Sequence, residues 1–304
     1  AASMILRRGK EEEGKTSMQM ASYVRVSTAE AALAAAKSAR GPVLYFAGGT
    51  DILVKQREND CYAGHDVIDI YGVEELRGVS DAGDRLRIGA LTTHATIAQD
   101  PLIQQHARIL ALACDTVGSL QIRNHATIGG NIGNASPAAD TLSALAVLDA
   151  RVEIRRGSET LLLPLYDVIL KPYATSLANG DLITAVLVNK LPEGCVSDFY
   201  KLGRRRALAI SRMTIATLLR RDADGVVDYF DMTLGATFPR PQRFADIPPL
   251  LLGKRPTEAD ILLTAKAMAD KIPAVAGIRH STKYKQPVAE KLAARVLRRL
   301  LADG

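Results

Sequence analysis

Apolar residues recur along the chain in short runs, and turn-favouring residues follow most of them. The run Val43–Ala47 is continuously apolar, which is typical of a strand buried on both faces, and Val67–Ile70 predicts a second buried strand. A helix is predicted to begin near Ser27–Glu30, where Ser or Thr can cap it, and to stop at Gly41-Pro42. This strand–loop–helix order predicts a small α/β domain at 21–75.

The pattern changes in the next segment, for which we predict a second domain at 76–193. A strand at Leu86–Leu91 precedes a helical region that runs from Thr96 to about Val117. Five turn-favouring residues within Gly129–Asn134 exclude a long helix there. The remaining predicted elements of this domain are a helix from about Asp140 to Leu148 and strands at Arg151–Arg155, Thr160–Leu163 and Asp181–Leu191.

A third domain is predicted at 194–304. Two strands flank the loop Gly203–Arg206, and a third strand follows the turn Asp222–Gly225. Two helices close the chain. The predicted strands are Asp198–Leu202, Arg212–Leu219 and Val226–Leu234, and the predicted helices are Glu258–Lys271 and Pro287–Leu301.

Charge and cysteine usage exclude several classes of function. The net charge is +6, but basic residues cluster only at Arg204–Arg206 and in the last helix, with no alternation of basic and aromatic residues, so we expect no nucleic-acid binding. No apolar run is long enough to span a membrane. Cys61, Cys114 and Cys195 lie far apart, which predicts no iron–sulfur or zinc site in this chain and favours a reducing cytoplasm. Residues 1–20 are interpreted as a flexible leader that lacks a signal-peptide core.

The first segment with candidate chemistry is Ala47-Gly48-Gly49-Thr50-Asp51, followed by Ile52. Two glycines at the end of a buried strand expose backbone N–H groups without a Cβ, and Thr50 adds a hydroxyl. Such a nest suits a phosphate or pyrophosphate. The alternative is a tight strand-to-helix turn capped by Thr50 or Asp51. The segment matches neither GxGxxG nor a Walker loop, so it does not favour those nucleotide-binding folds.

The second segment, Thr127-Ile128-Gly129-Gly130-Asn131, is interpreted as the same device, a strand that ends in two glycines. Small polar residues continue to Asn134 and Ser136. Asp140 heads the next helix, where it either accepts hydrogen bonds from ligand hydroxyls or serves as an N-cap. Two such loops, several polar donors and one placed carboxylate suit a ligand with a diphosphate and a polyol, and FAD is such a ligand.

These two segments, together with Gln121–Asn124 and Ala135–Asp140, resemble the FAD-binding medium subunits of the molybdenum hydroxylases, the xanthine dehydrogenase and carbon monoxide dehydrogenase family. Phe199–Arg205 and Ser281–Lys285 resemble the C-terminal domain of the same subunits. The resemblance implies an α+β fold: two α/β FAD-binding subdomains of the vanillyl-alcohol-oxidase type, then a C-terminal domain with a small antiparallel sheet and helices.

The resemblance also implies site residues. The first loop would hold the pyrophosphate, the second would form the opposite wall, and Asp140 would meet the ribityl or diphosphate side. Val117 and Gly118 would lie against one flavin face, and Lys201 would stabilise negative charge on the reduced flavin. Without the resemblance, a solvated lysine at a strand end is the simpler reading of Lys201. No side chain is predicted as catalytic or as a metal ligand. The implied FAD-binding residues are Ala47, Gly48, Gly49, Thr50, Asp51, Ile52, Val117, Gly118, Thr127, Ile128, Gly129, Gly130, Asn131, Asn134, Asp140 and Lys201.

The implied function is electron transfer. Electrons from a molybdopterin centre on a large subunit would pass through [2Fe–2S] clusters on a small subunit to FAD in this chain, and then to NAD or another acceptor. The assembly would be a heterotrimer or its dimer. Two alternatives remain: a self-sufficient flavin oxidoreductase of the same fold, and a docking subunit that has lost its flavin.

Three further candidates have no clear partner in the sequence. His94 and His125 lie near the proposed site without a carboxylate, Cys or Ser at informative spacing, so partly buried structural histidines are expected. Arg204–Arg206 is suited to steering an anionic acceptor or a docking partner, and a solvated basic turn explains it equally well.

Overall fold

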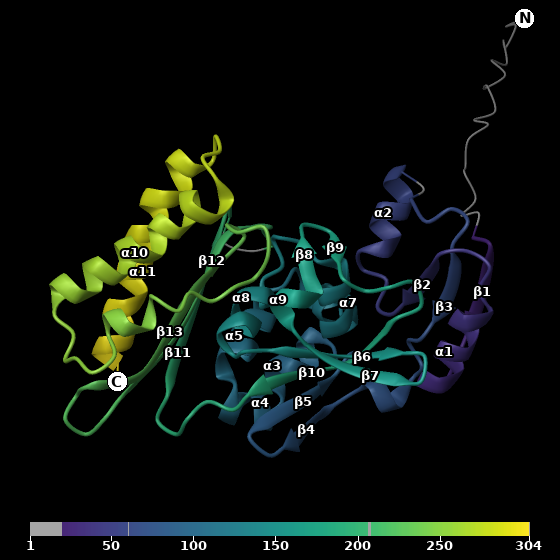
Figure 1. The fold of residues 1–304 in the computed structure, drawn as a ribbon, viewed down its shortest axis with the longest axis horizontal. Helices are drawn as coiled ribbons and strands as arrows, with labels where there is room; N and C mark the ends of the chain where they lie inside the picture. The colour runs from purple at the N-terminus through teal and green to yellow at the C-terminus, as the bar shows by residue number, and fades with distance from the viewer. Residues whose placement is uncertain (1–19, 60, 206–207, 304) are drawn as a thin grey trace, which may run out of the picture.

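The computed structural model describes residues 20–59, 61–205 and 208–303. The predicted leader at 1–20 therefore falls almost wholly outside the described residues. Three units, each built on its own β-sheet, lie in a row from the N-terminal to the C-terminal end (Figure 1). One main sheet falls in each of the ranges 21–75, 76–193 and 194–304, and a further two-stranded sheet lies in the second range. The limits of these domains stay a prediction.

The first unit is a three-stranded parallel sheet in the order β1-β3-β2. Helix α1 begins after Thr28, whose side chain accepts a hydrogen bond from the Ala31 N–H, as the capping pattern predicts. Ala32 and Ile68 lie in the small apolar core between this helix and the sheet. The elements are β1 (Ser22–Arg25), α1 (Ala29–Ser38), β2 (Val43–Phe46), α2 (Ile52–Asn59) and β3 (Asp66–Asp69).

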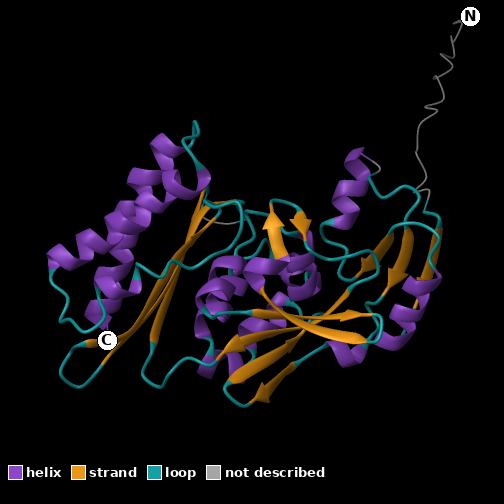
Figure 2. Cartoon of the chain, viewed as in Figure 1, coloured by secondary structure: helices purple, strands orange, loops and turns teal. Residues whose placement is uncertain are grey.

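The second unit is a five-stranded antiparallel sheet in the order β4-β5-β10-β6-β7, with short helices packed against it (Figure 2). Its strands are β4 (Val79–Ala82), β5 (Arg85–Gly89), β6 (Arg151–Arg156), β7 (Glu159–Pro164) and β10 (Leu182–Asn189). Its helices are α3 (His94–Gln99), α4 (Pro101–His106), α5 (Arg108–Asp115), α6 (Leu120–His125), α7 (Ile128–Asn134), α8 (Thr141–Val147) and α9 (Leu165–Val168). A 3-10 turn, η1 (Glu74–Leu76), precedes β4, and β8 (Ile169–Lys171) pairs with β9 (Ala174–Thr175).

The third unit is the antiparallel sheet β11-β12-β13, covered on one side by two long helices. Because side chains alternate along a strand, β12 faces two cores: Met213 and Ile215 pack toward the long helices, whereas Ala216 and Leu218 join the core of the second unit. The third unit is thus fixed to the second by an apolar interface. The elements are β11 (Val196–Gly203), β12 (Ser211–Arg221), β13 (Val227–Gly235), η2 (Pro248–Leu250), α10 (Glu258–Ala276) and α11 (Thr282–Asp303).

The α+β fold class is confirmed, and most predicted elements are present. The sequence missed four strands: β1, β4 and the short pair β8 and β9. Strands β1 and β4 are sheet-edge strands, with no buried residue to create an alternating pattern. The predicted helical region from Thr96 to Val117 is three helices, since Asp100 caps a new helix and Ala107 leaves helical geometry. Strand β2 is half-buried and is not buried on both faces.

Candidate functional site

The first glycine loop connects β2 to α2 and packs tightly against the second unit. A Cβ on Gly48 would lie 1.8 Å from the backbone oxygen of His125, so only glycine fits this approach. Gly49 has a φ of 69°, and a Cβ there would lie 2.5 Å from the ring of Phe46. The two glycines thus serve different needs, close contact for Gly48 and a left-handed turn for Gly49.

The donors of this loop are free. Within the described part of the chain, the backbone N–H groups of Gly48, Gly49, Thr50 and Asp51 and the Thr50 hydroxyl have no hydrogen-bond acceptor. They lie at the start of α2, where the helix dipole also favours an anion. The loop therefore offers a set of unused donors, and its residues fit an anionic diphosphate.

The prediction for the second glycine segment is wrong in its local structure. Thr127 ends no strand; it caps helix α7, and its hydroxyl accepts the N–H of Gly130 at 3.2 Å. The N–H of Ile128 donates to the Thr92 carbonyl at 3.1 Å and that of Gly129 to the Ala90 carbonyl at 2.9 Å. Thus the amides of this segment are bonded within the protein and do not form a second phosphate nest.

Two residues of the predicted contact set are buried. The side chain of Ile128 lies fully in the main core. Gly129 is also buried, and a Cβ on it would lie 2.7 Å from the Cβ of Ala90, so this glycine permits helix packing against the strand β5 end. Gly130, in contrast, is exposed on α7.

Helix α7 nevertheless brings the predicted polar residues together. Asn134 Nδ2 donates to Asp51 Oδ1 at 2.8 Å, and Lys55 Nζ donates to Asn134 Oδ1 at 2.5 Å. These bonds join the end of α7 to the start of α2. Nearer the third unit, the Asn131 carbonyl oxygen Oδ1 accepts the Thr141 hydroxyl at 2.6 Å. The predicted residues from Gly48 to Asp140 therefore lie along one continuous path.

Asp140 and Lys201 form the polar centre at the boundary with the third unit. Lys201 Nζ lies 2.6 Å from Asp140 Oδ2 and donates to the Thr116 carbonyl at 2.8 Å. The second carboxylate oxygen of Asp140 accepts the hydroxyl of Ser211. Asp140 occupies the N-cap position of α8 but makes no capping bond, so the capping alternative is wrong. The solvated reading of Lys201 is also wrong, because its side chain is only 14% exposed.

Burial is the largest influence on Asp140. It raises the pKa of the carboxyl, and the ammonium of Lys201 and the hydrogen bonds from Lys201 and Ser211 oppose that rise. Removing either ion of such a buried pair leaves the other charge uncompensated, which is strongly destabilising. The pair therefore places one fixed cation beside the proposed cofactor path.

The turn Val117–Gly118 follows directly on the residue that Lys201 contacts. Arg123 Nη1 donates to the carbonyls of Val117 and Gly118 at 3.2 and 3.5 Å, and Gly118 has a φ of 46°. Arg123 from α6 thus holds this turn, and Lys201 from β11 holds the residue before it. Lys201 therefore lies close to the turn in the structure.

Both histidine predictions need adjustment. His94 is fully buried, and its Nδ1 lies 3.5 Å from the thiol sulfur of Cys114. Burial, with a smaller contribution from Arg123, lowers the pKa of His94 to about 4, so its ring is neutral. His125 is exposed, and it is its backbone carbonyl that contacts Gly48.

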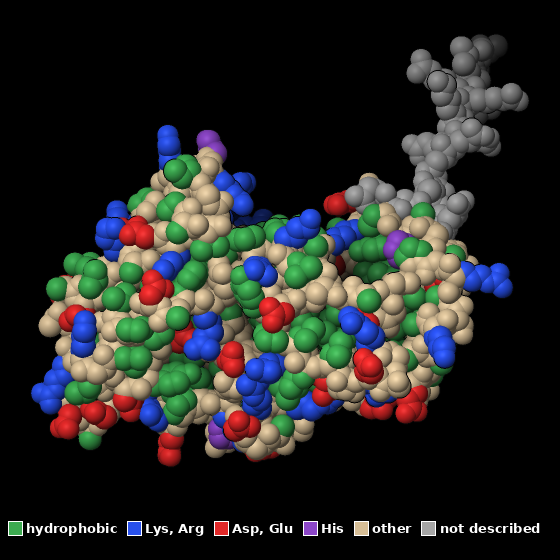
Figure 3. All heavy atoms as spheres, in the orientation of Figure 1, with side chains coloured by type: hydrophobic (Ala, Val, Ile, Leu, Met, Phe, Trp, Pro, Cys, Tyr) green, Lys and Arg blue, Asp and Glu red, His purple; other side chains and the backbone are tan. Residues whose placement is uncertain are grey.

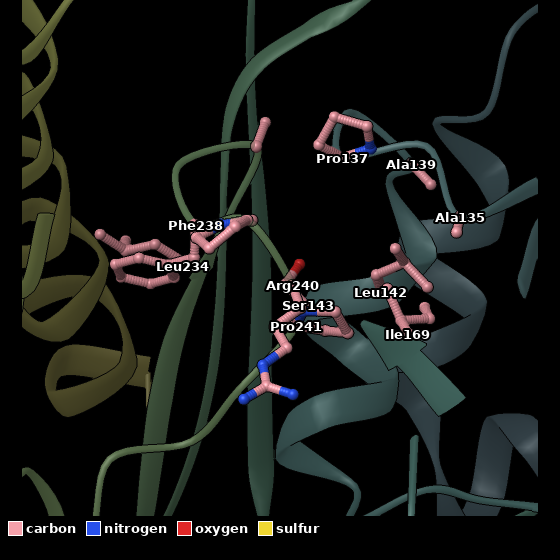
Figure 4. A pocket seen from close by; sticks show the side chains of 13 residues that line it. Ala135, Pro137, Ala139, Leu142, Ser143, Ile169, Leu234, Phe238, Arg240 and Pro241 are labelled. Carbon is pink, nitrogen blue, oxygen red and sulfur yellow. The ribbon is translucent and has the colours of Figure 1, made fainter. Parts of the chain in front are cut away.

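Two cavities lie at the boundary between the second and third units, and neither is lined by Asp140 or Lys201. Figure 4 shows a pocket of about 20 Å³ between Pro137 and Ala139 on one side and Leu234 and Phe238 on the other, room for a water molecule only. A larger cavity of about 570 Å³ lies farther along the boundary, near Asp149 and Asp231. On the face shown in Figure 3 the surface is hollowed beside α2, where the first unit adjoins the second. Over the described ranges there is no cluster of His, Cys, Asp or Glu suited to a metal ion, and no helix long and apolar enough to cross a membrane.

Comparison with known families decides the identity. Residues 16–190 match the FAD binding domain in molybdopterin dehydrogenase, and residues 198–300 match the CO dehydrogenase flavoprotein C-terminal domain. The chain belongs to this flavoprotein family. It is an oxidoreductase flavoprotein subunit, and its cofactor is FAD.

Curated relatives support this assignment over most of the chain. The nicotinate dehydrogenase FAD-subunit of Eubacterium barkeri is 33% identical over 85% of this chain and 90% of its own length. The putative xanthine dehydrogenase FAD-binding subunit of Escherichia coli (strain K12) is 34% identical over 73% of this chain and 76% of its own length. A similar fold is found in the structure of carbon monoxide dehydrogenase from Hydrogenophaga pseudoflava, with a TM-score of 0.84, 23% identity and coverage of 92% of this chain and 97% of the other.

Sequence reasoning missed three groups that build the site: Ser211, the Thr116 carbonyl and the His125 carbonyl. Ser211 follows an Arg-rich loop with no spacing pattern that links it to Asp140. Two of the three groups are backbone carbonyls, which any residue type supplies. Only the packing of the units reveals them.

Proposed function

We propose that this chain is the electron-transfer subunit of a molybdopterin-dependent hydroxylase or dehydrogenase. It would take electrons from [2Fe–2S] clusters on a small partner subunit and pass them to an external acceptor such as NAD. Bound FAD supplies the chemistry, because it accepts electrons singly and releases them as a pair. Several relatives are named as the medium chain or subunit of such enzymes, for instance the medium subunit of nicotine 6-hydroxylase and the medium chain of carbon monoxide dehydrogenase.

The observation that carries the cofactor site is the set of unused donors from Gly48 to Asp51. Gly49 is buried, Gly48 and Thr50 are half-buried and Asp51 is exposed, and all four follow one another at a helix start. Buried backbone donors without a partner are rare in folded proteins. We place the pyrophosphate here. The exposed face of Gly130 and the side chains of Asn131 and Asn134 would form the opposite wall.

At the other end of the path, Lys201 would lie beside the flavin ring. Its ammonium is fixed by Asp140 and by the Thr116 carbonyl, so it needs no reorganisation to stabilise a negative charge that develops nearby. Asp140 would face the ribityl side. The turn at Val117 and Gly118, held by Arg123, would cover one face of the ring. These remaining contacts are carried over, residue by residue, from the resemblance to the family.

The ionisable pair on this path, Asp140 and Lys201, is bonded to itself, which favours electron transfer over a self-sufficient oxidase. We also propose a cytoplasmic location, supported by three free cysteines at Cys61, Cys114 and Cys195.

The test is spectral. The purified full-length chain should show flavin absorbance, and Lys201→Met should lower the reduction potential of the bound flavin, whereas Lys201→Arg should keep it near the wild-type value. The assembled enzyme should reduce the flavin when substrate is added, while the isolated chain should show no turnover with the same substrate. A colourless chain with no FAD affinity, or full turnover by the isolated chain, would contradict the proposal.

A further inference from the structure

Two loops that lie far apart in the sequence meet at one end of the third unit. One joins β11 to β12 and includes Arg204 and Ile210; the other is the turn between α10 and α11, which includes Ile278 and Arg279. They are linked by Arg212, whose guanidinium carbon lies 5.4 Å from the centre of the Tyr284 ring. Figure 1 shows both connections at the same end of this unit.

Positive charge accumulates on these loops. The segments 203–212 and 277–285 contain Arg and Lys but no Asp or Glu. Within the described part of the protein, no carboxylate lies within ion-pair distance of Arg204, Arg212, Arg279 or Lys283. Burial, and then the neighbouring charges of Arg279 and Arg212, lower the pKa of Lys285. The chain itself leaves this charge unneutralised.

Large apolar side chains project among the same cations. Ile278 is 88% exposed, Ile210 is 81% exposed and Tyr284 is 45% exposed. Exposed aliphatic groups surrounded by charge are typical of protein docking sites, in which an apolar centre is surrounded by a polar rim. None of these residues lines either of the two cavities described above. The surface therefore projects outward and does not enclose a small molecule.

The base of the first loop is fixed at the candidate site. Lys201 on β11 and Ser211 on β12, which flank the loop, both bind the carboxylate of Asp140. At the tip, Arg205 Nη2 donates to the Leu208 carbonyl at 2.7 Å, and the Cβ of Ala209 packs against Gly203. A partner seated on this loop would thus lie beside the residues that we assign to the flavin.

We propose that Arg204, Ile210, Arg212, Ile278, Arg279 and Lys283 form a docking surface for an acidic patch on a partner protein chain. The unneutralised cations select an acidic surface, and the projecting isoleucines supply the apolar centre. The surface lies next to the proposed flavin path, where a protein that exchanges electrons with this chain has to approach. The docking itself does not depend on which electron acceptor the enzyme uses.

Cross-linking tests the partner chemistry directly. The tagged full-length chain is purified from its source cells with its bound chains, treated with a carbodiimide that joins amines to carboxylates, and mapped by mass spectrometry. Lys283 is expected to link to Asp or Glu of one partner chain. A complex whose cross-links to this chain all avoid Lys283, or a chain that purifies without any partner, overturns the proposal.

Charge reversal supplies the second measurement. Arg204→Glu with Arg279→Glu should weaken assembly about 10-fold or more at low salt, and the difference from wild type should shrink at high salt as the charges are screened. The control is Lys37→Glu with Lys171→Glu, which makes the same charge change at two exposed lysines away from this surface. Unchanged flavin absorbance confirms that each variant is folded.

Three results overturn the proposal: equal weakening by both pairs of substitutions, no weakening by the Arg204 and Arg279 pair, or an effect of that pair only on binding to phosphatidylserine vesicles. The last result would assign the surface to an anionic membrane. Failure of FAD binding in the wild-type chain would instead count against the proposed function and would leave the docking result to be judged by itself.

Discussion

The two diglycine segments look alike in sequence, but the structure uses them in opposite ways. At Gly48-Gly49 the backbone donors are left free, and the glycines let the loop approach a neighbouring carbonyl and turn. At Gly129-Gly130 the amides are bonded to Ala90 and to Thr127, and Gly129 is packed against β5. A pair of glycines therefore indicates a close backbone contact or an unusual turn. The surrounding packing decides whether that backbone serves ligand binding or the stability of the fold.

This comparison gives each segment a distinct response to mutation. Changes at the first loop should mainly affect FAD binding, with stability altered only where a side chain collides with backbone. Changes in the second should alter stability whether or not FAD is present. The predictions below follow that difference, from the largest expected effect to the smallest.

Gly48→Ala should have the largest effect. The new Cβ would lie 1.8 Å from the His125 carbonyl oxygen, and backbone cannot move aside as a flexible side chain does. We expect a loss of about 3 kcal/mol or more in the free energy of unfolding, and loss of FAD binding, because the loop must withdraw from α6. Urea unfolding and flavin titration measure the two effects. Gly72→Ala, where the nearest atom is 3.8 Å away, is the control and should change stability little.

Acid should lower the free energy of unfolding through His94. The backbone N–H of His94 donates to the Ala126 carbonyl at 3.0 Å, directly before the second diglycine segment. Its folded-state pKa of about 4 is below the ordinary 6.5, so the unfolded chain binds the proton more readily. The stability that neutral His94 provides is present above pH 6.5 and is lost as the pH falls toward 4, by about 3 kcal/mol.

The measurement compares wild type with His94→Leu, which has no imidazole to titrate. The difference in unfolding free energy between the two proteins should change between pH 6.5 and 4, with wild type losing more. Parallel curves over this range would show that His94 is protonated as easily in the folded state as in the unfolded one.

Gly129→Ala should lower stability by about 2 kcal/mol, because its Cβ would meet Ala90 at 2.7 Å in a packed core. The loss should be the same with and without FAD. Gly133→Ala lies in the same helix with its nearest neighbour 3.9 Å away, so it should be neutral or stabilising by up to about 1 kcal/mol. If FAD affinity fell far more than stability in Gly129→Ala, this glycine would belong to the ligand site after all.

The smallest effects come from a matched pair of threonines. Thr127→Ala removes the cap of α7 and should cost about 1 kcal/mol of stability in the flavin-free protein. Thr50 has no partner among the described residues, so Thr50→Ala should leave flavin-free stability within about 0.5 kcal/mol of wild type. It should instead weaken FAD binding by about 1 kcal/mol, the contribution of one hydrogen bond. If Thr50→Ala lowered flavin-free stability and Thr127→Ala weakened FAD binding, the roles that we assign to the two segments would be exchanged.

Much of this protein could be predicted from the sequence. Short apolar runs and turn residues predicted most strands and the long helices, since these patterns act over a few neighbouring residues. The glycine motifs, with the segments around them, predicted the family and the cofactor. The edge strands β1 and β4 were not predicted. Their residues are mostly exposed, so the sequence there has no alternation of apolar and polar positions.

The sequence by itself indicated the candidate residues: the glycines, Asp140 and Lys201. Only the tertiary structure decided what each does, because a free amide and a bonded amide have the same sequence. The N–H of Gly129 is bonded to the Ala90 carbonyl, and β12 brings the Ser211 hydroxyl against Asp140. A hydrogen bond depends on which atoms packing brings within about 3 Å, and most of these atoms come from distant parts of the chain.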